Sequence, residues 1–556
     1  MLEPETTRHR VTTKRVSSPI SDEIIRLVRS LFEERSLLDR VRRQDHRFAT
    51  LKQIADSREI RIVPDLLPLL AADETLAPHV AAVIAELVHD VTPVQLSWLD
   101  EQVRHGSYAQ YWSNAWHKLA PAAISRLAHT YDLNAAVIGL VASHANGFVR
   151  AAALEVLAQY NSGREIPFLS LRVNDWVEPV ADRASELLVS RLRPDNRHAV
   201  LNALPFIVRV LGQRRRDHTG IERALKSVLL SDAGEDALAR GKEFDTSVRR
   251  KMYELLISGG TTSKRRMLNA ALNDPDAVIR ARAIRSISAD PDFDDRAATL
   301  ERFLRDDRVP AVRRLALAAL SEHMPERLGA VFPQVLLDRA ASVRGLARFV
   351  ASTQQPALVP RTVYIEALVG TLPGQLPAAI EGVGETGSRA DTDLVAPFLA
   401  GNSPRIRRSA LRALAKLDAD RAVSAAIAAL SDDAPSVRTA AVHTLSSNAS
   451  RVNFDLVNRQ VSSLSDPKAR RNVLRVFLDA PKWDAPAFLL EALTDPDDGV
   501  RALAARLLDR WIEGFNRNQT QPTAKQLQRI GALLDSVASR MPEATARMLR
   551  FSIKSS

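Results

Sequence analysis

Arginines that return at a nearly constant interval are the residues with the clearest capacity for chemistry in this chain. Each follows a Val, Ile or Ala, as in PSVRTAAVHTL at 435–445, and in five units an aspartate stands six residues earlier. A guanidinium stays charged and its planar fork matches a carboxylate, so these arginines suit a structural role better than catalysis. The arginines are Arg150, Arg249, Arg280, Arg313, Arg344, Arg407, Arg438, Arg470 and Arg501, and the aspartates are Asp274, Asp307, Asp338, Asp432 and Asp495.

A second arginine directly follows four of the repeated arginines. One residue turns an α-helix by about 100°, so this second side chain is predicted to face outward. Its recurrence would make a basic stripe for an anionic partner, and the alternative is ordinary surface arginine in an Arg-rich chain. The four are Arg250, Arg314, Arg408 and Arg471, and a further candidate binding set is Arg214, Arg215 and Arg216 in the loop-like sequence GQRRRDHTG.

An aromatic cluster between residues 98 and 116 is a third candidate binding feature. It includes Tyr111, Trp112 and Trp116 in the sequence YAQYWSNAWHKL. Trp and Tyr are enriched at the energetic centres of protein interfaces, so the cluster could form a pocket or a partner site. The alternative is that these large side chains fill the core where the geometry of the chain changes.

Motifs for catalysis or metal binding are missing from the sequence or have another explanation. A GxGxxG run at 382–387 follows no expected strand and sits at a link between two repeated units, which argues against dinucleotide binding. There is no HExxH and no P-loop, and the 12 histidines show no metal-ligand spacing. We therefore expect no catalytic residue, no metal site and no cofactor, and the sequence favours a non-enzymatic role.

The repeated arginines are predicted to sit on pairs of helices. In AAIAALSDDAPSVRTAAVHTL at 425–445, apolar residues follow helical spacing on both sides of the turn SDDAP. From Arg249 to Arg501 the arginines lie 31 to 33 residues apart, except for one 63-residue interval after Arg344. That interval hides a degenerate unit whose arginine position is near Gln375. Neither helix of a pair could stand alone in water, so each unit must pack against its copies.

These units resemble HEAT repeats, in particular the phycobilisome-lyase type of HEAT-like repeat, in their D-P-x-x-V-R turn and the A-x-x-A-L helix that follows. The resemblance is strong from Asp245 to Trp511 and weaker from Leu133 to Leu188. It implies an all-α fold, an α-α superhelix or HEAT/armadillo-type solenoid, formed as a single extended repeat array. It also implies a ladder in which each arginine bonds turn carboxylates of its own and the adjacent repeat.

The repeat pattern divides the chain into segments of different regularity. We expect a disordered tail at 1–19, an N-terminal helical cap at 20–60, and diverged HEAT-like repeats with loop insertions at 61–244. Regular repeats are expected at 245–515, followed by a linker and C-terminal capping helices at 516–556.

Composition narrows the class of protein. The 556 residues include 77 basic and 66 acidic side chains, a formal net charge of +11 that is spread along the chain and leaves an anionic partner possible. With no cysteine, disulfides and Cys-based zinc sites are excluded. We see no signal peptide and no membrane-spanning stretch, and we expect a cytoplasmic protein.

The leading hypothesis for function is a scaffold or adaptor that binds a protein partner on the concave surface lined by the second helices. An alternative is a nucleic-acid-binding solenoid that uses the basic edge residues, either regulatory or similar to the HEAT-like DNA glycosylases. A further alternative is a lyase or chaperone role resembling the bilin lyases. Aromatic residues, which stack on bases, make up only 5% of the chain, and this favours the protein scaffold.

Overall fold

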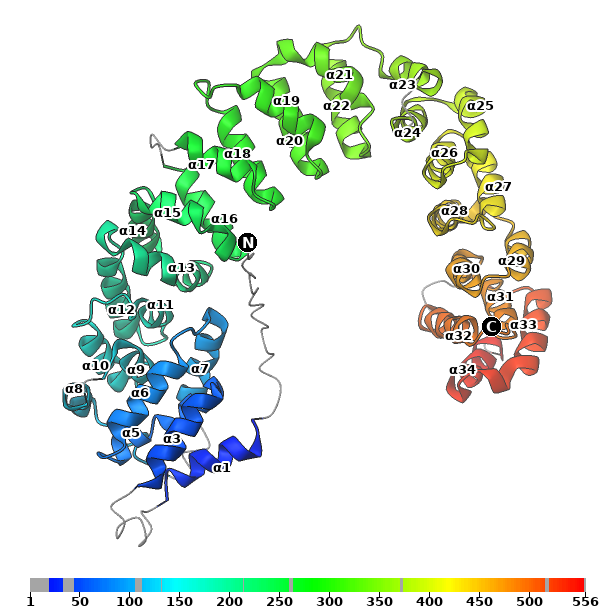
Figure 1. Ribbon diagram of the computed structural model, residues 1–556. Coiled ribbons are helices and arrows are strands. Elements are labelled where there is room, and N and C mark those ends of the chain that lie inside the picture. The colour runs from blue at the N-terminus through cyan, green and yellow to red at the C-terminus, as the bar shows by residue number, and fades with distance from the viewer. Residues whose placement is uncertain are drawn as a thin grey trace, which may run out of the picture. The chain divides into compact units, whose positions relative to one another are not determined.

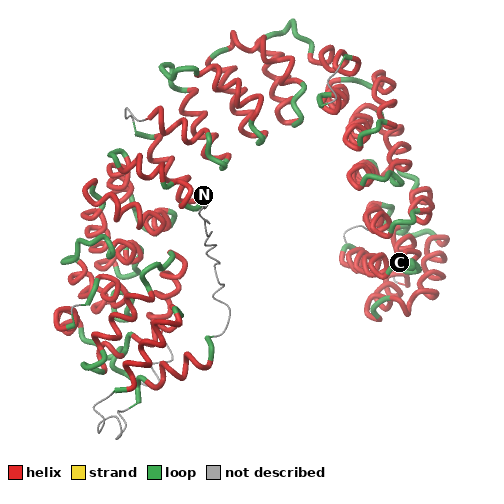
Figure 2. Tube along the Cα trace, in the orientation of Figure 1, coloured by secondary structure: helices red, strands yellow, loops and turns green. Residues whose placement is uncertain are grey.

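The computed structural model describes residues 20–33, 45–105, 113–131, 133–213, 215–259, 264–370, 374–515 and 520–554. Every regular element in these ranges is an α-helix or a short 3-10 helix, and no strand occurs in them (Figure 2). The prediction of an all-α fold of the α-α superhelix class is confirmed.

Contacts between residues divide the chain into two units, residues 1–283 and 284–556, here called the N-terminal and the C-terminal unit. The division falls inside α18 (Ala277–Ser288). The helices of the N-terminal unit before α18 are α1 (Asp22–Ser30), α3 (His46–Ser57), α4 (Val63–Leu66), α5 (Leu69–Ala72), α6 (Ala77–Leu87), α7 (Pro93–His105), α8 (Pro121–Thr130), α9 (Ala135–Val141), α10 (Gly147–Leu157), α11 (Ile166–Arg172), α12 (Glu178–Arg191), α13 (Arg197–Leu211), α14 (Thr219–Leu229), α15 (Ala233–Ala239), α16 (Thr246–Ile257) and α17 (Lys264–Leu272).

Within the N-terminal unit the helices form two rows from α8 onward (Figure 1). One row stacks α8, α10, α12, α14 and α16 in order, and the other stacks α9, α11, α13 and α15. Helices α6 and α7 pack against α9. Alternate helices therefore share a row, as expected when each pair packs on the next pair.

The C-terminal unit repeats this arrangement (Figure 1). Helices α20, α22, α24, α26, α28, α30 and α32 pack each against the next, and we call them the second helices because each is the second of its pair. The helices of this unit are α19 (Arg296–Asp306), α20 (Pro310–His323), α21 (Leu328–Leu336), α22 (Ala341–Gln354), α23 (Pro360–Val369), α24 (Leu376–Thr386), α25 (Thr392–Val395), α26 (Pro404–Leu417), α27 (Ala419–Ala429), α28 (Pro435–Ser447), α29 (Phe454–Ser463), α30 (Pro467–Val473), α31 (Ala485–Ala492), α32 (Asp498–Glu513), α33 (Ala524–Val537) and α34 (Glu543–Lys554).

The pair α27–α28 shows how the apolar pattern forms a core. The predicted stripe of α27 is buried at Ala422, Val423 and Ala426. On α28 the residues Val437 and Ala441 are buried in the same way. Small side chains at these positions let neighbouring helices approach closely, so thin apolar layers hold the repeats together.

The degenerate unit is held by close helix packing rather than by a link of glycines. Residues 382–386 belong to α24, so the expectation that the GxGxxG run lies between two repeats was wrong for most of the run. A Cβ atom on Gly382 would lie 2.3 Å from the ring of Tyr364 on α23. A Cβ on Gly384 would lie 2.6 Å from the Cα of Ala413 on α26. These glycines therefore allow α24 to contact its neighbours closely.

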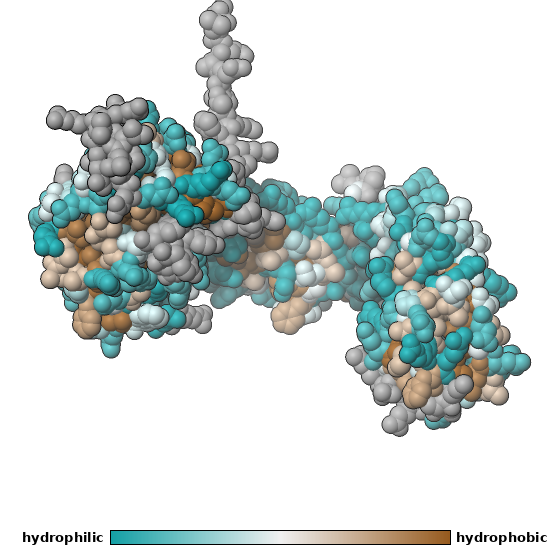
Figure 3. Space-filling view, turned by 90° about the horizontal axis from the view of Figure 1, so that it is seen from below, coloured by the Kyte–Doolittle hydropathy of each residue, from teal (hydrophilic) through white to brown (hydrophobic). Residues whose placement is uncertain are grey.

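The surface seen in Figure 3 is mostly hydrophilic, with smaller apolar patches between charged and polar side chains. Among the described residues, none of the helices combines the length and the apolar character needed to cross a bilayer.

Candidate functional site

Each repeated arginine is the fourth residue of its helix, and Arg313 on α20 shows what this position does. Its residue is 1% exposed, and its Nε and Nη2 donate to the two carboxylate oxygens of Asp338 at 2.7 Å each. Its Nη1 donates to the main-chain carbonyl of Asp307 at 2.7 Å. One guanidinium thus joins the turn of its own repeat to the turn of the next repeat.

The same contacts recur wherever the next turn supplies an aspartate 25 residues further on. The pairs are Arg150–Asp175, Arg249–Asp274, Arg313–Asp338, Arg407–Asp432 and Arg470–Asp495. Where an aspartate stands six residues before the arginine, its main-chain carbonyl accepts a hydrogen bond from that arginine. The pairs are Arg280–Asp274, Arg344–Asp338, Arg438–Asp432 and Arg501–Asp495. The expected bond from an arginine to the carboxylate of its own turn aspartate is not formed at Arg344, Arg438 and Arg501, because those carboxylates take the arginine of the preceding repeat.

Four arginines of this ladder, Arg280, Arg344, Arg438 and Arg501, have no aspartate 25 residues further on. Arg438 reaches Asp466 by one bond of 3.4 Å, and Arg501 pairs with Asp498 in the first turn of its own helix. For Arg344 the residue 25 positions on is Val369, because the degenerate unit lacks the turn aspartate. Arg344 instead donates to carboxylates on α24.

The arginines that follow the ladder do not all face outward. Arg250 is exposed but pairs with Asp276 at 2.8 Å, and Arg314 is exposed on α20. Arg408 and Arg471 are half-buried on α26 and α30. An exposed stripe was therefore the wrong expectation for these last two, because the neighbouring second helix covers part of each side chain.

Arg408 lines a groove of about 760 Å³ formed by the second helices α22, α24, α26 and α28, which we call the basic groove. Side chains four residues apart on a helix lie on the same face. In this way α24 contributes Glu381 and Glu385 to the groove, and α26 contributes a row of three cations. The cations are Arg408, Arg412 and Lys416, and α28 contributes Ser436, Thr439, His443 and Ser447.

The two carboxylates of α24 already pair with arginines of α22. Arg344 donates to Glu381 at 2.8 Å and to Glu385 at 2.5 Å, and Arg348 also pairs with Glu385. Burial opposes ionisation of Glu385, but the hydrogen bonds and charges of the two arginines outweigh burial and hold the pKa of this carboxyl below its usual range. Glu385 is therefore ionised and paired at neutral pH, and Glu381 is paired with Arg344 as well.

The cations of α26 have much weaker partners. Arg412 lies 3.6 Å from Glu381, and Lys416 lies 3.6 Å from Glu385. Arg408 has no hydrogen bond or ion pair with any described residue, and its Nε is buried. Since Arg344 and Arg348 offset the two glutamates, the face of α26 brings about three uncompensated positive charges to the groove. This arrangement can hold an anion.

Residues 378–453, which include α24, α26, α27 and α28, match the family model described as HEAT repeats. The chain therefore contains HEAT repeats. The phycobilisome-lyase subtype stays a prediction, and no curated protein matches the sequence.

Among solved structures, similar chains are found at low identity. Yeast Kap95p, in a structure of its binding to RanGDP, is 12% identical over 96% of this chain and 66% of its own, with a TM-score of 0.38. Importin β crystallised in ammonium sulfate is 12% identical over 96% of this chain and 67% of its own, with a TM-score of 0.30. Kap121p bound to RanGTP is 14% identical over 88% of this chain and 56% of its own, with a TM-score of 0.27. This HEAT-repeat chain therefore spans about two thirds or less of those chains.

The aromatic candidate Trp116 lies in the core of the N-terminal unit. It is 6% exposed, and its ring meets the ring of His144 edge-on at 5.0 Å between centroids. The Nε2 of His144 donates to the Trp116 carbonyl at 2.9 Å, and burial lowers the pKa of this histidine. Of the loop arginines, Arg215 is exposed and Arg216 pairs with Asp182. The other candidates of these two sets, Tyr111, Trp112 and Arg214, lie outside the described residues.

A different tryptophan is exposed on the N-terminal unit, and the sequence analysis passed over it. Trp176 precedes α12 and is 63% exposed, with the guanidinium carbons of Arg104 and Arg150 at 5.2 and 5.6 Å from its ring centroid. One HEAT repeat earlier, Phe148 at the start of α10 is 78% exposed. In other units the residue directly after the turn aspartate is Pro275, Arg308 or Pro496. A tryptophan at this position is therefore unusual in the sequence and could have drawn attention to Trp176.

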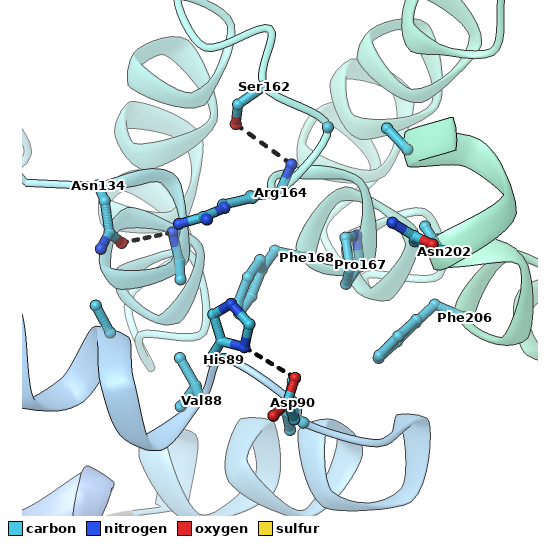
Figure 4. Close-up of a pocket in the computed structure, with 16 residues that line it drawn as sticks. Val88, His89, Asp90, Asn134, Ser162, Arg164, Pro167, Phe168, Asn202 and Phe206 are labelled. Atoms are coloured by element: carbon cyan, nitrogen blue, oxygen red, sulfur yellow. Dashed lines mark hydrogen bonds and ion pairs between the residues drawn. The ribbon is translucent and has the colours of Figure 1, made fainter. Parts of the chain in front are cut away.

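A second hollow, of about 640 Å³, lies in the N-terminal unit between the α6–α7 loop, α9, α11 and α13 (Figure 4). His89 contacts Asp90 at 2.8 Å, and Phe168 and Phe206 contribute apolar surface. Arg164 extends over the same hollow in Figure 4. Because one acid, one arginine and one histidine line it, this hollow does not select one sign of charge as the basic groove does. Among the described residues, no group of three or more His, Asp or Glu is placed to share a metal ion.

Proposed function

We propose that this HEAT-repeat protein is a non-enzymatic scaffold whose second helices hold an acidic segment of a protein partner. The observation that carries the proposal is the row Arg408, Arg412 and Lys416 in the basic groove. Arg408 pairs with no carboxylate of the described residues, and Arg412 and Lys416 have only contacts of 3.6 Å to glutamates that Arg344 already holds. Repeat arrays use the exposed sides of their stacked helices as extended binding surfaces. An acidic segment would neutralise this row and release its bound counterions.

The groove suits a peptide of mixed chemistry better than a nucleic acid. Glu381 and Glu385 bound the groove on the side of α24, where a continuous chain of phosphates would meet two negative charges. Of the side chains that line the groove, His443 carries the only ring, so bases would find little to stack on. A peptide can place an acidic side chain beside the cations of α26 and a hydrogen-bond donor beside the glutamates of α24.

Binding to labelled peptide pools tests this proposal. Pools of acidic, neutral and basic short peptides, and single-stranded and duplex DNA of matched charge, would be titrated by fluorescence anisotropy at several salt concentrations. We expect the acidic pool to bind most tightly. The triple variant Arg408→Glu, Arg412→Glu and Lys416→Glu should then lose about tenfold or more in affinity.

A matched control separates the groove from the general positive charge of the chain. Arg302, Arg459 and Arg547 are exposed on α19, α29 and α34 and do not line the groove. Reversing these three to Glu changes the net charge equally and should leave affinity within about twofold, apart from long-range steering. Equal losses in both triple variants, or tighter binding of DNA than of acidic peptides, would overturn the proposed function.

A further inference from the structure

We infer that the part of the basic groove between α26 and α28 is a subsite for a phosphate monoester, carried by a phosphorylated side chain of the partner. The inference rests on the proposed function and names the chemistry of the group that α26 holds. It concerns one residue of the partner segment, because the cations lie on one short face of one helix.

The number of free charges favours a dianion. With the glutamates of α24 offset by Arg344 and Arg348, three positive charges remain on α26. A carboxylate would offset one of them. A phosphate monoester carries about −1.5 to −2 at neutral pH and has three strong acceptor oxygens, so it offsets most of this charge from a single side chain.

Arg408 is a hydrogen-bond donor in the groove without an acceptor among the described residues. Its Nε is buried and donates to no described residue, while the adjacent Arg407 makes its full set of bonds to Asp432 and Gly401. Because the Nε itself is closed to solvent, a bound oxygen would accept from the part of the guanidinium that lines the groove, which also donates to no described residue. Phosphate oxygens suit the fork of arginine particularly well.

Residues of α28 complete the subsite from the opposite side. Ser436 is exposed and has no partner among the described residues, so its hydroxyl can donate to a bound oxygen. Thr439 donates its hydroxyl to Pro435 and receives a bond from Asn472, so it contributes shape rather than a free donor. The donors therefore gather at α26 and at the start of α28, and the carboxylates lie on the far side of α26.

The two carboxylates also limit what the subsite accepts. Glu381 lies within 3.6 Å of Arg412, and Glu385 lies at the same distance from Lys416. A single phosphate needs to lie only beside Arg408, whereas a polyphosphate or a nucleic-acid backbone that follows α26 would pass both glutamates. This selects an isolated phosphate on a peptide over a row of phosphates.

The test uses peptide pools that share randomised flanks and differ at a single central residue. The centre is phosphoserine, glutamate or serine, and affinity for the full-length protein is measured by fluorescence anisotropy. We expect the phosphoserine pool to bind at least about tenfold more tightly than the serine pool, with the glutamate pool between them. Inorganic phosphate and a single-stranded oligonucleotide are titrated as competitors.

Variants assign the effect to Arg408. In Arg408→Gln the preference for phosphoserine over serine should fall to about threefold or less, while the control Arg302→Gln keeps it. Arg412→Gln and Lys416→Gln provide the same test if Arg408→Gln unfolds, as judged by circular dichroism. In each of these variants the readout is the ratio of phosphoserine-pool to serine-pool affinity, because losing one groove cation also weakens the acidic members of the serine pool.

Each outcome decides between the inference and its competitors. If phosphoserine and glutamate pools bind equally and both depend on α26, the phosphate subsite is wrong and the acidic-segment scaffold stands. If no pool binds above serine, both proposals fail. If the oligonucleotide binds more tightly than every pool and loses affinity in Arg408→Gln, the groove is a nucleic-acid site and the inference is overturned.

Discussion

Arg407 and Arg408 are neighbours on α26, yet they belong to regions of opposite character. Arg407 lies on the turn edge, where ladder arginines meet aspartates of the next repeat, as with Asp432 at 2.7 Å. Arg408 lies on the groove face, where no carboxylate of the described residues pairs with it. The same side-chain chemistry is therefore structural on one side of a helix and available to a partner one residue later. What separates the two uses is the position of carboxylates on the neighbouring helices.

The largest expected difference between these regions is in stability, at Arg313. Replacing Arg313 by Ala leaves Asp338 without its bidentate partner in a buried site, and we expect a loss of about 3–5 kcal/mol in the free energy of unfolding. The neighbouring variant Arg314→Ala removes an exposed side chain and should cost less than about 0.5 kcal/mol. Urea unfolding followed by circular dichroism measures both. Equal losses would contradict the division into two regions.

A smaller loss is expected where the ladder itself is weak. Arg438 has one bond of 3.4 Å to Asp466, and the side chain of that aspartate is 48% exposed. Because water can solvate the stranded carboxylate, Arg438→Ala should cost about 1–2 kcal/mol. The same urea series compares it with Arg313→Ala. A loss at Arg438 as large as that at Arg313 would show that the carbonyl contacts, which both arginines make, dominate the ladder.

Acid should weaken the wall of the groove through Glu385. The pKa of this group is lowered in the folded protein, so its contribution to stability is fully present above the pKa of the unfolded chain, about 4.5. That contribution is lost as the pH falls through the lower, folded-state pKa. In Glu385→Gln the free energy of unfolding should be lower at pH 7 and should fall less between pH 5 and pH 3 than in the parent, which denaturant titrations at each pH would measure.

An identical pH profile in the parent and in Glu385→Gln would mean that Arg344 and Arg348 do not hold this carboxylate more tightly than the unfolded chain does. Asp432 on the turn edge has a pKa that is lowered in the same direction, first by its hydrogen bonds from Arg407. Asp432→Asn is therefore the control: it removes the acid-dependent stability of the ladder and leaves that of the groove wall in place.

The smallest change in stability is expected at Arg408. Arg408→Gln removes no ion pair, so the free energy of unfolding should change by less than about 0.5 kcal/mol. Arg407→Gln, one residue away, breaks the bidentate pair with Asp432 and should cost about 1–2 kcal/mol. Parallel denaturant melts would show the contrast. A large loss in Arg408→Gln alone would mean that this side chain supports the fold, and the groove would lose its main candidate for binding.

Much of the fold follows from periodicity that can be read in the sequence. The buried faces of α27 and α28 coincide with the apolar stripes of residues 425–445, because a helix that repeats every 3.6 residues places them on one side. The position of the ladder arginines also follows from the pattern. Their partners were only partly predictable, since the aspartate six residues earlier is conspicuous and the aspartate 25 residues later belongs to another unit.

The candidate site was less accessible to sequence reasoning. Arg408 was selected by its place after a ladder arginine, but its buried, unpaired Nε depends on how closely α24 and α28 approach α26. Arg412 and Lys416 follow Arg408 at intervals of four residues, which can be read in the sequence. Only the structure shows that they lie beside the paired glutamates of α24. Trp176 was overlooked because exposure of a single aromatic residue in a turn has no periodic signature.

The sequence by itself determined the helical pairs and their spacing, because apolar periodicity and turn residues act within one unit. It also determined that an arginine recurs at the fourth residue of the second helices. Only the tertiary structure decided which charges are satisfied, because an ion pair depends on distances of a few ångströms between helices of different repeats. Thus Arg344 pairs with Glu381 and Glu385 because the next unit lacks the turn aspartate. The cations of α26 then line the groove beside glutamates that are already paired.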